Sequence, residues 1–502
     1  KKRGKKLYTR PISIYEVNLL SWKRKEGNIQ YSYIELAREL VKYVKKMDYT
    51  HIEFMPLSEY PLDASWGYQI TGYFAPTSRF GTPKDLMFLI DQCHQNDIGV
   101  IMDWVPAHFC KDDYGLARFD GTYLFESLDK MKAENEQWGT LNFDYTKPEV
   151  FSFLISNAMY WHDYYHIDGL RMDAVAYMLY LDFGGKDIRN KFGGRENLEA
   201  IEFIKRLNSV VFKHYPDTMM IAEESTAWPK VSHPIDEGGL GFNFKWNMGW
   251  MNDILKYMEL DPIYRKDHHG ALTFSMMYAF SENFILPFSH DEVVHGKKSM
   301  VDKMPGSYEQ KFANLRLLYQ YMFAHPGKKL LFMGNEIAQF LEWREYESIE
   351  WQLLDLEPHK LMQKFVSDLN GLYKDETTLY ELDTTYDGFQ WIDHSNSQES
   401  IISFERLDKA GERLICIFNF TPVPRPDYPI GVLEEGTYRT VLTSDHKRYG
   451  GSTERVKRYK AKPEAFHGRD LSIRIDLPPL AAIYLKLDRK PQNEHKTGGE
   501  QA

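Results

Sequence analysis

The segment GLRMDA places Arg171 two positions before Asp173 in an otherwise apolar stretch. If this segment is a β-strand, side chains two positions apart project from the same face, so the guanidinium and the carboxylate are neighbours. A guanidinium within about 4–6 Å lowers the pKa of a carboxylate and keeps it anionic. The pair is therefore either a nucleophile with its positioning cation or, as the simpler interpretation of one pair taken alone, a buried structural ion pair.

Three other apolar segments also end in ionisable residues. They end in MDWVPAH, IAEES and FSHDEVVHG, which contain Asp103, His108, Glu223, Glu224, His290, Asp291, Glu292 and His295. A single polar strand end is ordinary, because loops begin there. Carboxylates at the same end of four parallel strands instead converge on one site.

The residue types in these segments favour glycoside chemistry over a metal site. Metal sites usually show close local spacing, such as two histidines one helical turn apart, and these segments lack it. Two carboxylates flanking one bond, with imidazole and guanidinium donors, suit an oxocarbenium-like transition state. Aromatic side chains in expected loops can stack on sugar rings, although each is as readily a core residue: Trp66, Tyr68, Trp104, Trp138 and Trp343.

The segments that must position these residues are of two alternating kinds, strand-like and helical. Runs rich in β-branched and aromatic residues predict eight strands, at 11–19, 50–57, 98–106, 167–175, 218–225, 241–247, 283–291 and 328–336. Amphipathic stretches between them predict helices, among them 33–47, 82–96, 197–212 and 308–323. Eight strands alternating with helices predict an α/β fold, a (β/α)8 TIM barrel with its site at the carboxyl ends of the strands.

After about residue 380 the alternation of strand-like and helical segments ends, which predicts a second structural unit. Strand-like segments with little helical period follow one another there, at 388–395, 400–407, 413–421, 437–444 and 471–487. We therefore expect a C-terminal antiparallel β-sandwich. The expected organisation is a catalytic barrel over 1–380, the sandwich over 381–487 and a disordered tail over 488–502, where apolar residues are lacking.

Composition argues against several classes of protein. The net charge is −10 with acidic and basic residues interspersed, so we expect no nucleic-acid partner, and the basic run at 1–6 is interpreted as a solvated stub. No run of eighteen apolar residues is present, so we expect no membrane partner. Cys93, Cys110 and Cys416 are far apart and without metal-ligand spacing, which is typical of reduced thiols in a cytoplasmic protein. We also expect a monomer.

The four strand ends DWVPAH, GLRMDAV, IAEEST and FSHDEVVHGKK resemble, in order, the signature segments of the α-amylase superfamily. Longer segments such as SWGYQITGYFAPTSRFGTPKDL and KFANLRLLYQYMFAHPGKKLLFMGNE resemble the bacterial glycogen branching enzymes, the 1,4-α-glucan branching enzymes. Members of that family also carry an N-terminal carbohydrate-binding β-sandwich, which we expect to be absent because the chain starts at the first barrel strand. Two departures are Cys110, where many relatives have proline, and Tyr177, where a small residue is common.

The resemblance implies a role for each site residue. Asp173 corresponds to the nucleophile, Glu223 to the general acid and base, and Asp291 to a third carboxylate that steadies the distorted sugar. Spacing alone does not decide whether Glu223 or Glu224 is the general acid and base. The resemblance indicates Glu223. The residues implied around the bound sugar are Tyr68, Asp103, His108, Arg171 and His290, and we add Trp66 as a stacking residue.

The resemblance also implies an activity. A retaining transglycosylase of glycogen biosynthesis would cleave an α-1,4 bond in glycogen, amylose or a maltooligosaccharide and transfer the chain to a 6-hydroxyl, forming an α-1,6 branch. That chemistry requires no metal and no cofactor, and retention predicts about 5 to 5.5 Å between the carboxyl groups of Asp173 and Glu223. An α-glucan hydrolase of amylase or debranching type would use the same carboxylates with water as acceptor. A silent glucan-binding protein is the other alternative, disfavoured by the presence of all three carboxylates.

Overall fold

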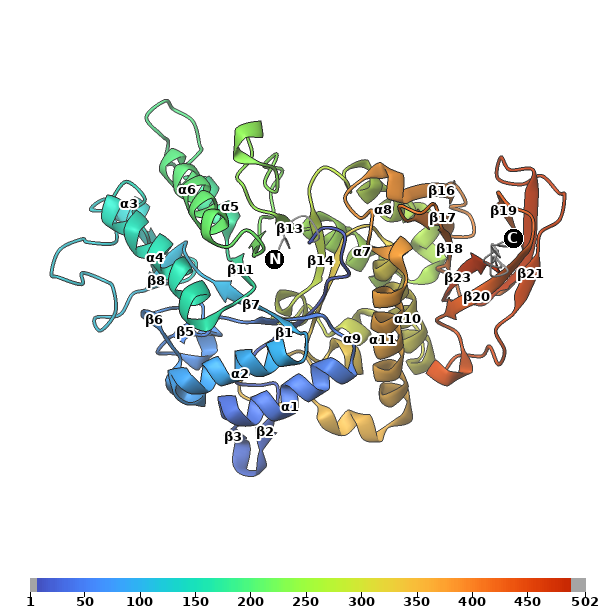
Figure 1. The fold of residues 1–502 in the computed structure, drawn as a ribbon, viewed down its shortest axis with the longest axis horizontal. Helices are drawn as coiled ribbons and strands as arrows, with labels where there is room; N and C mark the ends of the chain where they lie inside the picture. The colour runs from blue at the N-terminus through green and yellow to red at the C-terminus, as the bar shows by residue number, and fades with distance from the viewer. Residues whose placement is uncertain (1–6, 489–502) are drawn as a thin grey trace, which may run out of the picture.

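A computed structural model describes residues 7–488, and its centre is a closed barrel of eight parallel strands (Figure 1). Each strand pairs with the next along the chain, and the last pairs with the first. The strands are β1 (Ser13–Val17), β4 (His51–Phe54), β7 (Gly99–Trp104), β11 (Gly169–Met172), β12 (Met219–Ala222), β13 (Phe244–Trp246), β14 (Phe284–Phe288) and β15 (Lys328–Phe332). One of them lies in each of the eight predicted segments, so the predicted (β/α)8 barrel is confirmed.

Helices surround the barrel, and four of them match the predicted stretches: α1 (Tyr33–Lys46), α2 (Pro83–Gln95), α6 (Leu198–His214) and α10 (Tyr308–Ala324). The sequence sets where α2 begins, because Thr82 and Asp85 cap each other's backbone N–H groups and Pro83 occupies the first turn. Other long helices are α4 (Pro148–Tyr165), α7 (Met248–Glu259) and α11 (Glu357–Asp375). In the described chain, β12 and β13 are joined by a loop with only a short 3-10 turn at Ile235–Glu237.

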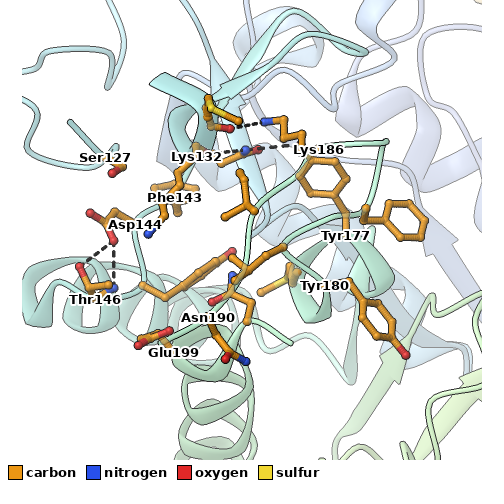
Figure 2. A pocket seen from close by; sticks show the side chains of 18 of the residues that line it. Ser127, Lys132, Phe143, Asp144, Thr146, Tyr177, Tyr180, Lys186, Asn190 and Glu199 are labelled. Atoms are coloured by element: carbon orange, nitrogen blue, oxygen red, sulfur yellow. Dashed lines mark hydrogen bonds between the residues drawn. The ribbon is translucent and has the colours of Figure 1, made fainter. Parts of the chain in front are cut away.

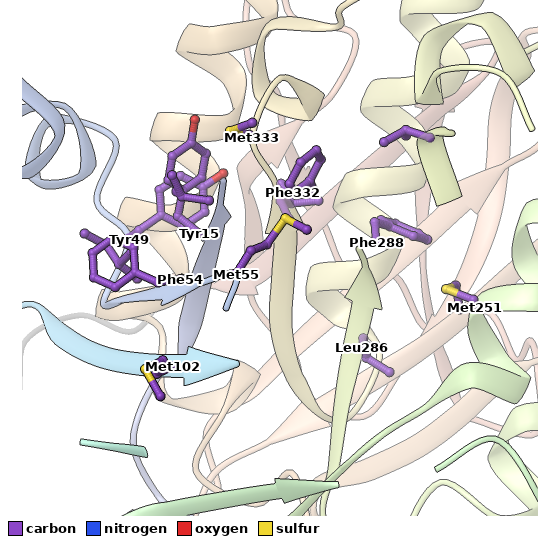
Figure 3. Close-up of a cluster of buried hydrophobic side chains, with 14 of the residues drawn as sticks. Tyr15, Tyr49, Phe54, Met55, Met102, Met251, Leu286, Phe288, Phe332 and Met333 are labelled. Carbon is purple, nitrogen blue, oxygen red and sulfur yellow. The ribbon is translucent and has the colours of Figure 1, made fainter. Parts of the chain in front are cut away.

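The barrel interior changes from apolar to charged toward the carboxyl ends of the strands. One buried cluster fills it with Ile14, Ile101, Ile221, Ile285 and Leu330 among others. The next inward-facing positions along four strands are ionisable: Glu16 on β1, Glu53 on β4, Asp103 on β7 and Arg171 on β11. Alternate residues of the barrel strands face the helices instead and form the main apolar core. Figure 3 shows this core around Phe54, Met102 and Leu286. The barrel thus presents a charged layer at one end.

A small three-stranded sheet stands next to this charged end, between β7 and α4. It contains β8 (His108–Cys110), β9 (Glu134–Asn135) and β10 (Thr140–Asn142). The strands are too short to give a periodic signal, and the sequence did not predict them. These strands position two candidate site residues, because β8 carries His108 and the turn between β9 and β10 carries Trp138.

The C-terminal part is the predicted antiparallel sandwich. Six strands form one sheet, β16 (Phe389–Asp393), β17 (Ile401–Leu407), β18 (Arg413–Asn419), β20 (Thr437–Thr443), β21 (Arg458–Lys460) and β23 (Ala481–Leu487). β19 (Arg425–Val432) pairs with β22 (Leu471–Leu477) in a second sheet. The sequence missed β19, whose Pro426 and Pro429 withhold two backbone donors, and the very short β21.

Buried charges join the sandwich to the barrel. The Lys328 ammonium lies 3.0 Å from Asp383 Oδ2, and the Arg406 guanidinium on β17 donates to Asp383 Oδ1 at 2.8 Å and to the carbonyl of Ala324 at 2.6 Å. All of these side chains are almost fully buried. The predicted boundary at residues 380 and 381 stays a prediction. The basic run at 1–6 and, except for Asp488, the predicted tail lie outside the described residues.

Within residues 7–488, no helix combines the length and the apolar character needed to cross a membrane.

Candidate functional site

A cavity of about 410 Å3 lies at the carboxyl ends of the barrel strands. Its walls come from loops that follow β4, β7, β11 and β14. It is lined by Ser65, Trp66, Tyr68, Gln69, His108, Trp138, Asp173, His290, Asp291 and His295. Six of the predicted site residues therefore meet around one space. Asp103 and Arg171 lie directly beneath it in the charged layer.

The Arg171 guanidinium joins three of the predicted carboxylates. Its Nη1 donates to both oxygens of Asp103 at 2.9 Å and to Asp173 Oδ1 at 2.7 Å. Its Nη2 lies 4.0 Å from Glu223 Oε2. Arg171 is 1% exposed, whereas the side chain of Asp173 keeps 16% of its surface open. The ion pair is thus buried on the cation's side, and its carboxylate partner faces the cavity.

Glu223 and Glu224 have different surroundings, although they are adjacent. Glu223 Oε2 accepts a hydrogen bond from the backbone N–H of Ala174 at 2.8 Å, next to Asp173. Burial raises the pKa of Glu223 to about 7, against the opposing effect of the Arg171 charge. Glu224 is fully buried and accepts from the Lys245 ammonium at 2.7 Å. Of the two, Glu223 is the carboxyl that lies beside Asp173, and its raised pKa suits a proton donor.

His290 is held between a buried carboxylate and the cavity. Its Nδ1 lies 2.5 Å from Glu16 Oε1, and its backbone N–H donates to Glu16 Oε2 at 3.0 Å. Its Nε2 lies 3.2 Å from the Tyr68 hydroxyl and 3.5 Å from Asp291 Oδ1. Burial opposes protonation, but the charges of Asp291 and Glu16 outweigh it and raise the pKa of His290 to about 9. At neutral pH the imidazolium can thus donate on both sides.

The surroundings of three other predicted residues, Asp103, His108 and Asp291, also shift their pKa values. The Tyr68 hydroxyl donates to Asp103 Oδ2 at 2.5 Å, and burial raises the pKa of Asp103 to about 7 despite Arg171. Burial lowers the pKa of His108 to about 4, so this imidazole is neutral. Burial raises the pKa of Asp291, but the charges of His290 and Arg171 outweigh that effect, and the pKa lies below its ordinary value.

Sequence reasoning missed two carboxyl groups in the charged layer, Glu16 and Glu53. They are neighbours across the β1–β4 pair. Glu16 positions His290, whereas the carboxyl oxygens of Glu53 have no hydrogen-bond partner among the described residues. Burial and the charge of Glu16 raise the pKa of Glu53 well above its ordinary value. The only signal for either residue is a single glutamate inside an apolar run.

Glu53→Gln is expected to raise the Tm at pH 8 and to leave it unchanged near pH 4. A carboxyl whose pKa is raised in the folded state binds its proton more tightly there than in the unfolded chain, whose value is about 4.5. The folded state therefore loses stability as pH rises above about 4.5, and a glutamine removes this loss. Thermal unfolding of both proteins across this pH range measures the effect. A Tm difference independent of pH would contradict it.

Two of the aromatic candidates for sugar stacking are wrong. Trp104 is fully buried, and its Nε1 donates to Asn157 Oδ1 at 2.7 Å. It follows the inward-facing Asp103, so alternation turns it toward the helices. Trp343 is 5% exposed and donates through Nε1 to Ser21 Oγ at 2.8 Å. Trp66, Tyr68 and Trp138 do line the cavity.

The departure at Tyr177 lies at the edge of the site. Its ring lies 5.0 Å from the ring of Trp138, which lines the catalytic cavity. On its other side Tyr177 lines a second cavity of about 220 Å3, shown in Figure 2 between Lys186, Phe143 and Tyr180. Cys110 is buried at the end of β8, in the three-stranded sheet. Tyr177 therefore contacts a wall residue of the first cavity and itself lines the second.

Taken together, these groups can carry out a double displacement at a glycosidic carbon. Asp173 is a carboxylate open to the cavity, Glu223 is a carboxyl with a pKa of about 7, and Asp291 is a third carboxylate on the cavity wall. A carboxylate nucleophile and a carboxyl proton donor are the two groups that a retaining glycosidase mechanism requires. Within residues 7–488, no three side chains of His, Cys, Asp or Glu gather to hold a metal ion.

The chain is similar to known proteins over almost all of its length. A family model described as "Alpha amylase, catalytic domain" matches residues 37–120 and 132–401, and one described as "Alpha amylase, C-terminal all-beta domain" matches 391–488. The chain is 58% identical over 490 residues to a 1,4-alpha-glucan branching enzyme of Halothermothrix orenii, covering 97% of this chain and 78% of that protein. It is 56% identical over 481 residues to the enzyme of that name from Aquifex aeolicus, covering 95% and 76%.

Among solved structures, the chain is similar to the α-amylase of Geobacillus thermoleovorans complexed with acarbose. The TM-score is 0.71, and the match covers 95% of this chain and 98% of that chain at 16% sequence identity. At this identity the likeness concerns the fold alone.

Proposed function

The chain belongs to the 1,4-α-glucan branching enzymes of the α-amylase family, and we propose that it acts as such a transferase in glycogen biosynthesis. In this proposal it cleaves an α-1,4 bond of glycogen, amylose or a maltooligosaccharide and transfers the released chain to a 6-hydroxyl, which creates an α-1,6 branch. The observation that carries the proposal is the contact of the Arg171 guanidinium with Asp173 and its approach to Glu223. One cation thereby binds the proposed nucleophile, which lines the cavity, and approaches the proposed proton donor.

In the first half-reaction, a carboxylate oxygen of Asp173 attacks C1 of the bound sugar. The C1–O bond to the leaving chain breaks, and Glu223 gives its proton to the departing 4-oxygen. A pKa of about 7 leaves a substantial fraction of Glu223 protonated at neutral pH, ready for this step. The Arg171 guanidinium keeps Asp173 oriented, and its burial shields that contact from solvent.

In the second half-reaction, a 6-hydroxyl of the acceptor glucan attacks C1 of the glycosyl ester. Glu223, now ionised, takes the proton of that hydroxyl, and the carboxylate of Asp173 is released. The configuration at C1 is inverted twice and is therefore retained. Retention requires about 5 to 5.5 Å between the two carboxyl groups, and this separation stays a prediction.

The charges around the cavity suit the cationic transition state of both steps. Asp173 and Asp291 supply negative charge on the cavity wall, next to the position of the oxocarbenium-like carbon. His290 and the neutral His108 are donors for sugar hydroxyls, and the ring of Tyr68 offers an apolar face. Trp66 lines the same cavity.

An assay with amylose distinguishes transfer to a glucan from transfer to water. We expect the iodine absorbance of amylose to fall without a matching increase in reducing ends, because each cleavage is followed by transfer to a hydroxyl. Hydrolysis of the α-1,6 bonds of the product should then release short chains that untreated amylose lacks. If one new reducing end accompanies each cleavage, the enzyme is a hydrolase and the proposal is wrong.

We propose further that the protein is a cytoplasmic monomer and that catalysis resides in the barrel, within residues 1–380. Cys93, Cys110 and Cys416 are all buried free thiols, which supports a reducing compartment. The cavity is built from barrel loops alone, so the chemistry needs no second subunit in this proposal.

A further inference from the structure

Two residues with strained backbones meet on the wall of the catalytic cavity. Trp66 has φ 57° and ψ 12°, and His295 has φ 55°. Left-handed backbone is uncommon for residues other than glycine and is an outlier for a bulky aromatic residue. Such strain persists only where the surroundings enforce it, and it concentrates at functional sites. The two rings are stacked, with centroids 5.2 Å apart and planes at 23°.

The loop that carries His295 is held by one carboxylate from the loop after β15. Glu342 Oε2 accepts from the backbone N–H of Gly296 at 3.1 Å, and Oε1 accepts from that of Lys298 at 2.6 Å. Lys298 is also left-handed, with φ 67°. Glu342 therefore fixes the backbone on the carboxyl side of His295, in a conformation that this segment would otherwise rarely adopt.

The ring of His295 has a rigid support and an open side. Trp66 also packs against the buried Trp343, whose ring centroid lies 4.9 Å away. His295 lies over Trp66, is exposed, and lines the same cavity as Asp173 and Asp291. The stack thus fixes the plane of the imidazole but leaves its nitrogens available for hydrogen bonds with a ligand.

The direction from Asp173 to His295 identifies the part of the substrate that would lie there. In a retaining mechanism the proton donor lies toward the leaving group, and the nucleophile lies beneath the sugar that becomes covalently bound. The cavity is lined by Asp173 and Asp291 but not by Glu223. A glucan that continues through this cavity toward His295 is therefore the chain that is transferred.

We propose that His295 binds the transferred chain, through hydrogen bonds from its imidazole to hydroxyls of a sugar beyond the one attached to Asp173. Trp66 fixes the ring, and Glu342 is the positioning residue that fixes the loop. Imidazole nitrogens form hydrogen bonds as donors or acceptors, and sugar hydroxyls are both donors and acceptors. The inference rests on the proposed function only for the direction in which the chain runs.

His295→Ala is expected to raise the KM for amylose about tenfold and to leave kcat within about threefold, as for the loss of one or two hydrogen bonds made throughout the reaction. His295→Gln should recover part of this loss, because the amide retains a donor and an acceptor. His214→Ala is the matched control, since His214 is exposed in the last turn of α6, at the opposite end of the barrel.

Glu342→Gln tests the positioning role, with Glu347→Gln as its control. The first variant weakens the acceptor of two backbone N–H groups, and we expect an intermediate rise in KM. Glu347 is in the same loop, and its side chain is 52% exposed with an ion pair to Arg344 at 3.5 Å. Removal of its charge should leave KM unchanged. Equal effects of the two variants would show that surface charge, and not the clamp on the loop, is responsible.

A binding measurement separates this inference from the proposed function. In an Asp173→Asn background, which we expect to be inactive, maltoheptaose should bind about tenfold more weakly when His295 is also alanine. An unchanged affinity would overturn the inference, as would a loss confined to kcat, which would indicate that His295 acts through the neighbouring Asp291. A hydrolase would fail the amylose assay and still show the binding effect, so the two failures are distinguishable.

Discussion

Asp173→Asn is expected to lower the rate of chain transfer by at least about 10^4-fold, the scale seen when a catalytic nucleophile is removed. An amide does not displace the leaving chain from C1, and it leaves the Arg171 guanidinium with one carboxylate contact fewer. The fold should survive, because Arg171 keeps both of its contacts with Asp103. Initial rates of branching, measured with amylose, test this expectation.

Binding and a matched variant show whether the loss is chemical. The affinity of Asp173→Asn for maltoheptaose should stay close to that of the unaltered protein, since Trp66, Tyr68 and His290 still line the cavity. Asp236→Asn makes the same chemical change at an exposed residue outside the site and should have no effect. A rate that survives Asp173→Asn would mean that another carboxylate forms the glycosyl ester.

Glu223→Gln is expected to lower the transfer rate on amylose by about 10^2- to 10^4-fold, the usual contribution of general acid–base catalysis. A donor whose leaving group needs no proton, such as a maltosyl fluoride, should still form the glycosyl ester. In the unaltered enzyme the rate should decline above about pH 7, as Glu223 loses its proton. The variant should lose this decline. A decline that persisted in the variant would come from Asp103, whose pKa is also about 7, and not from Glu223.

Glu224→Gln is the control for the adjacent carboxylate. It removes the charge that faces the Lys245 ammonium, and an unpaired buried charge is costly, so thermal stability should fall. The decline of the rate above about pH 7 should persist in the folded enzyme. If Glu224→Gln abolished that decline and Glu223→Gln did not, the acid and base would be Glu224.

The barrel and the convergence of its polar strand ends were predictable because both follow from local patterns. Alternating β-rich and helical segments fix the number of strands, and the topology of a barrel then brings the strand ends around Asp173, His108 and His290 to one opening. The same alternation could have excluded Trp104, because Asp103 and Trp104 cannot both face the barrel interior. That error came from treating the end of a strand as a loop.

The missed parts of the site depend on contacts between distant segments. Glu16 becomes the partner of His290 only when β1 and β14 lie on either side of β15. Glu53 matters because a second carboxyl lies beside it across a strand pair, which no local pattern reveals. Glu342 is similar, since its partners Gly296 and Lys298 follow a different strand. Contacts of this kind join residues that are distant in the sequence, so they can be recognised only once the fold is known.

The buried charges at the junction of barrel and sandwich limit how this architecture can be recombined. Lys328 comes from the last barrel strand, whereas Asp383 and Arg406 come from the chain that follows α11. A crossover near residue 380 that joined the barrel of one relative to the sandwich of another would inherit Lys328 from one parent and both Asp383 and Arg406 from the other. In evolution and in protein engineering, the barrel and the sandwich should therefore be exchanged together, or both sides of this junction should change together.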